Sequence, residues 1–175
     1  IESDPKKIVL AKKIILPGVG AFDTAMKNIR KSQKLLDCLS YKVLSEKIPI
    51  LGICLGMQIL TRSSEEGKER GLGWIPGKTI KFPNFDKLKV PHMGWNIASS
   101  TQKNFLTNGI KEDSRYYFAH SYYVKVDKPE NVIMRTNYGI EFDSAINYQN
   151  IYGVQFHPEK SHKFGLEIIK NFYNL

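Results

Sequence analysis

An apolar run that ends in a cysteine between glycines constrains this chain more than any other feature. Residues 49–53 have the composition of a buried strand, and residues 55–60 are helix-like. Cys54 lies between them, within the sequence Gly52-Ile53-Cys54-Leu55-Gly56. A nucleophile on such a strand–helix turn has a strained backbone, and its neighbours must be small so that strand and helix can approach each other. The pattern therefore predicts a parallel α/β sheet with Cys54 at the carboxyl end of a strand.

The position of Cys54 also predicts its chemistry. The amino end of the following helix carries partial positive charge, which is expected to lower the pKa of the thiol. The backbone N–H of Leu55 is expected to point to where an oxyanion forms during acyl transfer. A buried structural cysteine is the alternative interpretation. It suits Cys38, which lies in an apolar helical segment, but it does not explain the two glycines around Cys54.

A nucleophile of this kind needs a general base, and His157 is the best-placed histidine. It lies in Gly153-Val154-Gln155-Phe156-His157-Pro158-Glu159, at the end of a predicted strand. His157 would accept the Cys54 proton while Glu159 holds the imidazole tautomer. His-Pro-Glu alone is equally typical of a surface loop, but a nucleophile about a hundred residues away favours a catalytic triad. The other histidines are interpreted as hydrogen-bonded structural residues or as exposed: His92, His120 and His162.

The remaining pattern predicts one α/β domain over residues 1–175. Residues 13–16 form a second apolar strand, and amphipathic helical segments follow it. The second half is rich in β-formers separated by turn residues, which predicts antiparallel strands over 116–126, 132–137, 142–148 and 151–156. Leu166, Ile169 and Tyr173 stand at helical spacing in a closing helix over 165–173. A doubly wound sheet begins with a further strand and helix, about thirty residues, which we expect to be missing ahead of Ile8.

Composition narrows the functional classes. The formal charge is +9, but it comes mostly from scattered lysines, with 26 basic residues in all, so we expect a solvated surface and no nucleic-acid partner. No apolar run reaches membrane-spanning length and the first residues are polar, so neither a membrane nor a secretory signal is expected. Two cysteines form no disulfide framework, which favours the cytoplasm. No Cys/His cluster has metal-ligand spacing, so neither metal nor cofactor is expected.

At this point the motifs resemble a known family. Gly52-Ile53-Cys54-Leu55-Gly56-Met57-Gln58, together with the His157 motif, resembles the class I glutamine amidotransferases. More narrowly, the chain is similar to the glutaminase subunits of imidazole glycerol phosphate synthases, through Pro17-Gly18-Val19-Gly20-Ala21-Phe22, Val90-Pro91-His92-Met93-Gly94-Trp95-Asn96 and Tyr117-Phe118-Ala119-His120-Ser121-Tyr122. The resemblance runs from about Ile8 to the end of the chain. It implies a flavodoxin-like, three-layer fold with a mixed sheet.

The resemblance also implies roles for individual residues. Cys54, His157 and Glu159 would be the catalytic triad. The oxyanion hole would comprise Val19, Gly20 and Leu55, and the glutamine site Gly18, Gly56, Gln58, Glu66, Ser121 and Tyr122. Met93, Trp95 and Lys160 would face a (βα)₈-barrel cyclase or synthase subunit in a heterodimer. Without the resemblance, Glu66 would be read as part of a solvated turn and Trp95 equally as a core aromatic.

Three other functions remain open on sequence grounds. Paralogous amidotransferases supply ammonia to synthases that modify cell-surface sugars, and their motifs overlap with these. A catalytically silent binding module on the same fold is disfavoured because all three triad residues are present. A cysteine peptidase on a related sheet has no use for Gln58 or for residues 90–96.

Overall fold

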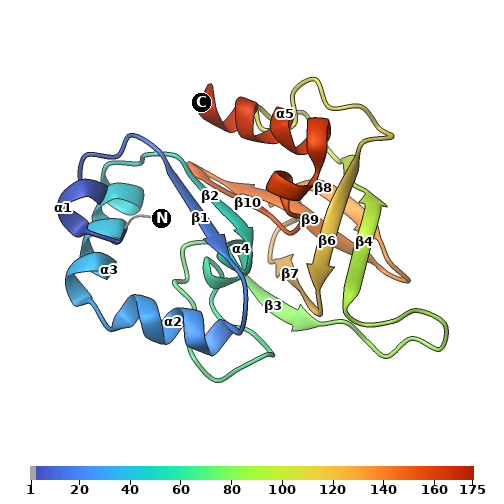
Figure 1. Ribbon diagram of the computed structural model, residues 1–175, viewed down its shortest axis with the longest axis horizontal. Coiled ribbons are helices and arrows are strands. Elements are labelled where there is room, and N and C mark those ends of the chain that lie inside the picture. Colours follow the sequence, from blue (N-terminus) through green and yellow to red (C-terminus); the bar gives the residue numbers. More distant parts are fainter. Residues whose placement is uncertain (1–2) are drawn as a thin grey trace.

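A mixed β-sheet forms the centre of the protein, of which the computed structural model describes residues 3–175 (Figure 1). Within these residues the sheet has the strand order β1-β2-β10-β9-β8-β5. β1, β2 and β10 run parallel, whereas β9, β8 and β5 are antiparallel to their neighbours, so the expected mixed sheet is confirmed. The strands are β1 (Ile14–Gly18), β2 (Ile50–Cys54), β5 (Ser99–Ser100), β8 (Val132–Asn137), β9 (Glu141–Tyr148) and β10 (Ile151–Val154).

Helices cover both faces of this sheet, which gives three layers. Leu51 and Ile53 of β2 pack in one core cluster with Ile168 and Phe172 of the C-terminal helix. Ile50, on the other face of β2, lies in a second cluster that includes residues of α3 and α4. The period-2 alternation of a strand explains this division. The helices are α1 (Pro5–Ile8), α2 (Phe22–Arg30), α3 (Gln33–Ser40) with a π-helical extension (Tyr41–Ser45), α4 (Leu55–Ile59), α5 (His162–Tyr173), and 3₁₀ turns at Pro129–Asn131 and Pro158–Lys160.

Two antiparallel strand pairs beside the main sheet were only partly expected. The β-rich segment 116–126 divides at Ser121 into β6 (Arg115–His120) and β7 (Tyr122–Val126). β6 pairs with β4 (His92–Ile97), and β7 pairs with β3 (Gly77–Lys81). The sequence pattern does not predict β3 or β4, because both are short and β4 contains Gly94 and two polar residues. The split at Ser121 lets one continuous segment serve two strand pairs.

Two predicted elements differ in detail from those observed. β1 continues through Pro17 to Gly18, which an end strand tolerates because the missing N–H can face away from the ladder. The closing helix begins at His162 rather than at residue 165. Its buried apolar side chains are those of Ile168 and Phe172, whereas Leu166 and Tyr173, whose spacing predicted the helix, are exposed.

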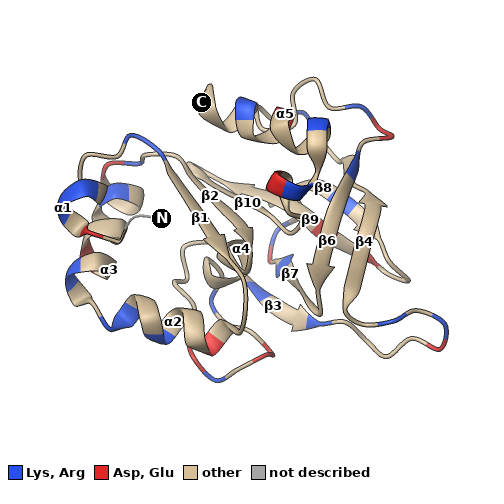
Figure 2. Ribbon diagram, in the orientation of Figure 1, with Lys and Arg blue, Asp and Glu red and all other residues tan. Residues whose placement is uncertain are grey.

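The basic residues are dispersed, as expected. Figure 2 shows Lys and Arg on α1, α2, α5 and several strands and loops. In residues 3–175, no helix has the length and apolar character needed to cross a membrane.

Candidate active site

Cys54 occupies the sharp turn between β2 and α4. Its backbone has φ 53° and ψ −113°, a conformation that residues other than glycine rarely adopt. A Cβ at Gly52 would lie 2.6 Å from the Gly56 oxygen, and a Cβ at Gly56 would lie 1.8 Å from the oxygen of Leu16 in β1. Both glycines are therefore required for strand and helix to pack. The predicted strained elbow is confirmed.

The thiol of Cys54 is buried, with 7% of the residue exposed. Its Sγ lies 4.0 Å from the Ala119 oxygen, and Gln155 Nε2 donates toward it at 3.7 Å. Burial raises the pKa of the thiol to about 11, and the hydrogen bond from the Leu55 N–H lowers it by a smaller amount. The expectation of a lowered pKa is therefore wrong, because desolvation of the thiolate outweighs the helix terminus.

His157 lies just beyond β10, after Gln155 and Phe156, and directly before the 3₁₀ turn Pro158–Lys160. Its backbone N–H donates to the Tyr117 oxygen at 2.9 Å, which attaches it to β6. Its Nδ1 lies 2.8 Å from Glu159 Oε1. The imidazole is buried, whereas the Glu159 side chain is 55% exposed. Glu159 thus engages Nδ1 and, among the described residues, leaves Nε2 without a hydrogen-bond partner.

One cavity of about 360 Å³ brings the predicted site together. Glu159 is absent from its lining but contacts His157. Gly18 and Gly56 pack β1 against α4 instead, since a Cβ on Gly18 would lie 2.8 Å from the Gly56 nitrogen. Trp95 lies outside the lining as well. The cavity is lined by Val19, Gly20, Cys54, Leu55, Gln58, Glu66, Pro91, Met93, Ala119, His120, Ser121, Tyr122, His157 and Lys160.

Gln155 is a site residue to which sequence analysis assigned no role. Its side chain is fully buried. Its Oε1 accepts a hydrogen bond from Gln58 Nε2 at 3.1 Å, while its Nε2 points at Cys54 Sγ. Gln58 Nε2 also donates to the Tyr122 oxygen at 3.0 Å. The position of Gln155 two residues before His157 was the available signal, because period-2 alternation puts the two on the same side of the chain.

The family of the chain follows from comparison with known proteins. Residues 2–175 match the family model described as glutamine amidotransferase class-I. The chain belongs to this family. This amidotransferase is 55% identical to imidazole glycerol phosphate synthase subunit HisH 2 of Methanococcus maripaludis, over 98% of the chain and 85% of the relative. It is 49% identical to the subunit HisH 2 of Pseudomonas aeruginosa, over 94% of the chain and 81% of the relative.

Solved structures support the fold of the amidotransferase. A structure of PurLQS from Thermotoga maritima superposes with a TM-score of 0.69 at 18% identity, covering 93% of this chain and 79% of the other. At that identity the likeness concerns the fold alone. The mixed sheet described above belongs to that shared fold.

Glu66 enters the amidotransferase cavity from the loop between α4 and β3. Its Oε2 accepts a hydrogen bond from the Phe22 N–H at 3.0 Å. The carboxylate thereby contacts the first turn of α2, which begins two residues after Gly20. Glu66 is therefore not part of a freely solvated turn, and it connects the loop to the segment of Val19 and Gly20.

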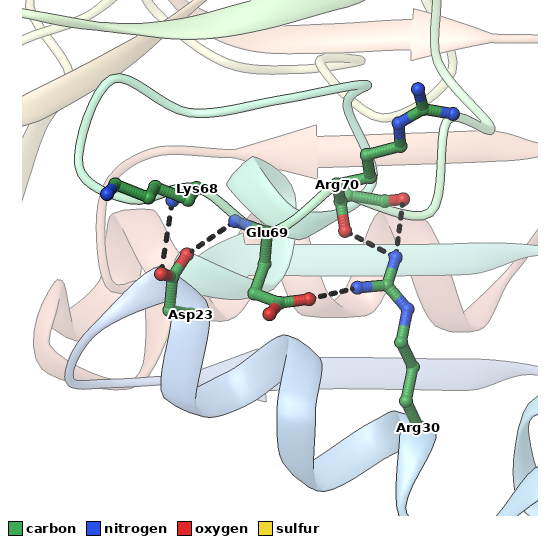
Figure 3. Close-up of polar contacts among 6 residues, drawn as sticks. Asp23, Arg30, Lys68, Glu69 and Arg70 are labelled. Carbon is green, nitrogen blue, oxygen red and sulfur yellow. Dashed lines mark hydrogen bonds and ion pairs between the residues drawn. The ribbon is translucent and has the colours of Figure 1, made fainter.

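The same loop is fastened along α2 by charged side chains (Figure 3). The Asp23 carboxylate accepts hydrogen bonds from the backbone N–H groups of Lys68 at 3.1 Å and Glu69 at 3.0 Å. These two bonds hold the pKa of Asp23 below its ordinary value. Further along α2, Arg30 donates to Glu69 Oε2 at 2.8 Å and to the Arg70 oxygen at 2.5 Å. The loop that carries Glu66 is therefore anchored at both ends of α2.

The outer rim of the cavity carries the residues assigned to a partner surface. Met93 is 62% exposed and Trp95 is 47% exposed, so Trp95 is not a core aromatic. Its ring stacks on that of His162, with centroids 5.4 Å apart. Lys160 Nζ lies 5.6 Å from the centre of the Tyr117 ring. His162 is exposed, as predicted.

His92 and His120 are buried and hydrogen-bonded to each other, which confirms their structural interpretation. Burial lowers the pKa of His92 to about 4 and that of His120 to about 3. An unfolded histidine has a pKa of about 6.5, so below that pH the unfolded chain binds more protons than the folded one. The stability that the two neutral rings contribute is therefore fully present above about pH 6.5. It is lost as the pH falls toward the pKa values of the folded state.

We expect the free energy of unfolding to fall by about 2 kcal/mol per ring between pH 7 and pH 5. Urea denaturation at the two pH values measures this. A His162→Gln variant serves as the control and should show the full pH dependence, because its histidine is exposed. A His92→Asn variant should lose about half of it. Equal stability of the wild-type protein at pH 7 and pH 5 would contradict the prediction.

Proposed function

We propose that this chain is the glutaminase subunit of an imidazole glycerol phosphate synthase, hydrolysing glutamine and delivering ammonia to a synthase subunit in histidine biosynthesis. The observation that carries the proposal is the meeting of Cys54 and His157 in the lining of one cavity, with Glu159 bound to Nδ1 of the imidazole. Relatives at 49% and 55% identity that bear this subunit name support the choice of synthase. The printed names of these two relatives refer to the synthase and not to sugar modification.

The first half of the proposed reaction is acyl transfer to Cys54. The thiol is protonated at rest because its pKa is about 11. His157 Nε2 therefore accepts the proton as sulfur attacks the carboxamide carbon of glutamine. The Leu55 N–H and the backbone of Val19 and Gly20 stabilise the oxyanion. His157 then gives the proton to the departing nitrogen, the C–N bond breaks, and ammonia leaves a glutamyl thioester.

The second half hydrolyses the thioester. His157 Nε2 takes a proton from water, whose oxygen attacks the carbonyl carbon. The C–S bond breaks, the thiol is restored with that proton, and glutamate leaves. Glu159 stabilises the imidazolium formed in both halves.

The remaining cavity residues bind glutamine in this proposal. Glu66 offers a carboxylate to the substrate ammonium group, and Gln58 with the Ser121-Tyr122 backbone forms the opposite wall. Gly18 and Gly56 act indirectly, by allowing the elbow to pack. Residues 1–175 act as one glutaminase domain.

The partner is a (βα)₈-barrel cyclase, which forms a heterodimer with this chain. The exposed Met93 and Trp95 and the nearby Lys160 provide its contact surface, since Met and aromatic residues are enriched at protein interfaces. Direct delivery matters because free ammonia becomes protonated at neutral pH. The pair acts in the cytoplasm, where Cys38 and Cys54 remain reduced.

The test is glutamate release by the purified chain, alone and with the cyclase subunit and a nucleotide substrate analogue. We expect slow turnover alone and a large increase in the complex. If this cyclase has no effect but a glutamine analogue is trapped as a thioester on Cys54, the glutaminase is retained and the synthase assignment is rejected. If nothing is trapped on Cys54, the enzymatic proposal is wrong.

Asp23→Ala is expected to raise KM for glutamine by about tenfold, while kcat changes little. Asp23 holds the backbone of the loop that carries Glu66, and losing two hydrogen bonds to a charged group weakens that hold. Steady-state kinetics of the complex measure both constants. Asp113→Ala removes an exposed carboxylate elsewhere and should leave both constants unchanged. A fall in kcat at constant KM would contradict the positioning role of Asp23.

A further inference from the structure

Strand β4 has two faces with different surroundings. Met93, Trp95 and Ile97 are exposed, by 62%, 47% and 40%, whereas His92 is buried. In the β4–β6 ladder, His92 stands directly opposite His120, which lines the cavity. Opposed residues of an antiparallel pair have neighbouring side chains. Polar groups on the inner face of β4 are therefore within reach of the active site.

A chain of hydrogen bonds follows this route. Asn96 Nδ2 lies 3.3 Å from His92 Nε2, and His92 Nδ1 lies 3.1 Å from His120 Nε2. His120 Nδ1 lies 2.8 Å from the Tyr122 oxygen, which also accepts from Gln58. The chain thus runs from a partly exposed amide on β4 to a carbonyl in the cavity wall.

A local bend makes the first of these contacts possible. In a straight strand, the Cα atoms of residues four positions apart are separated by about 13 Å. Gly94, midway between His92 and Asn96, has a backbone φ of 126°, which residues other than glycine rarely adopt. We attribute the meeting of the two side chains to this bend.

At the Asn96 end, the contacts of the amide fix the direction in which these hydrogen bonds are donated. Asn96 Oδ1 accepts from the Ile97 N–H at 2.8 Å, and Nδ2 donates to the Asn137 oxygen at 2.9 Å, so the orientation of the amide is fixed independently of His92. Nδ2 has no acceptor lone pair. His92 Nε2 must therefore accept, and a neutral His92 carries its proton on Nδ1, facing His120.

The carbonyl end requires the same direction. The Tyr122 oxygen only accepts, so His120 must donate from Nδ1. A neutral His120 then accepts at Nε2, where His92 Nδ1 donates. Both rings are neutral at pH 7, since burial lowers the pKa of each well below that value. The two ends of the chain thus agree on one pair of tautomers.

We propose that Asn96, His92 and His120 form a hydrogen-bond relay of fixed direction that holds the Tyr122 carbonyl in the wall of the glutamine site. This inference rests on the proposed function. Asn96 and His92 are positioning residues, which act through Tyr122 and the Gln58 side chain bound to it. The relay also joins the active site to the strand whose opposite face carries Met93 and Trp95.

The direction of the relay is testable without any assay of activity. Two-bond ¹⁵N–¹H NMR spectra of the imidazole rings at pH 7 should show both His92 and His120 as neutral Nδ1–H tautomers. In Asn96→Asp, the carboxylate presents only acceptors to His92 Nε2, so His92 should leave the Nδ1–H form. The matched variant Asn108→Asp, at an exposed position, should leave both rings unchanged. An Nε2–H tautomer in the wild-type protein, or an unaltered His92 in Asn96→Asp, would overturn the relay.

The positioning role is tested by kinetics of the complex. Asn96→Asp should raise KM for glutamine by about tenfold with little change in kcat, and Asn108→Asp should change neither. His92→Asn and His92→Leu are similar in size and lose the same ring contacts, but asparagine keeps an N–H near the position of Nδ1. KM should therefore be about tenfold lower in His92→Asn than in His92→Leu.

The outcomes separate the relay from the function on which it rests. Equal KM values in the two His92 variants, or an unchanged KM in Asn96→Asp, would reject the positioning role while glutamine hydrolysis stands. A wild-type complex that hydrolyses no glutamine would reject the proposed function and the positioning role with it. In that case the tautomers still decide whether the relay exists.

Discussion

Replacing Cys54 with alanine is expected to lower kcat for glutamine hydrolysis by about 10⁶-fold, the loss typical of removing a protease nucleophile. The thiol is the proposed attacking group, and no other cysteine lines the cavity in residues 3–175. Alanine at this position removes the sulfur but retains a Cβ, so the elbow keeps its backbone. Glutamate release by the complex measures the loss.

Cys38→Ala is the matched control. Cys38 Sγ donates to the Pro5 oxygen at 3.5 Å and lies in α3, away from the cavity. Its substitution should leave kcat and KM unchanged. Two cysteine variants with the same activity would show that Cys54 is not the nucleophile. A glutamine analogue should label the wild-type protein and Cys38→Ala, but not Cys54→Ala.

Replacing Gly56 with alanine is expected to destabilise the protein by about 4 kcal/mol or more. The added Cβ would lie 1.8 Å from the backbone oxygen of Leu16, so β1 and α4 must separate. Neither atom belongs to a flexible side chain that can rotate away. Urea denaturation measures the change, and activity should fall with it because α4 begins at the elbow.

Gly73→Ala is the control variant, which shows how much stability is lost when alanine replaces a glycine without a steric clash. Gly73 has φ 69° and no neighbouring atom within 4 Å of the added Cβ. Only backbone strain remains, which we expect to cost about 1 to 2 kcal/mol. Similar losses in the two variants would show that the overlap with Leu16 is relieved by small shifts and that the elbow tolerates a larger residue.

The elbow and the sheet could be predicted because their signals are local. Residues 49–56 specify a buried strand, a small-residue turn and a helix within one short segment, and the structure confirms all three. Strands β8, β9 and β10 follow from β-rich runs with turn residues between them. By contrast, β3 and β4 are stabilised by partners far along the chain, so their own composition gives little indication of a strand.

Two contacts of the site that join distant residues were not predicted from the sequence. Glu66 contacts Phe22 across 44 positions, and Gln155 contacts Cys54 across 101. The predicted lowering of the Cys54 thiol pKa was wrong for a related reason. The helix terminus is visible in the sequence, but the burial that outweighs it depends on residues distant along the chain, such as Ala119 and Gln155, which only the fold brings close to the thiol.

The raised pKa of Cys54 has a consequence for the chemical durability of the protein. With a pKa of about 11, only about one molecule in 10⁴ carries a thiolate at pH 7. Peroxides and electrophiles attack the thiolate rather than the thiol. The resting thiol of Cys54 is therefore expected to react more slowly with peroxides and electrophiles than an exposed cysteine does.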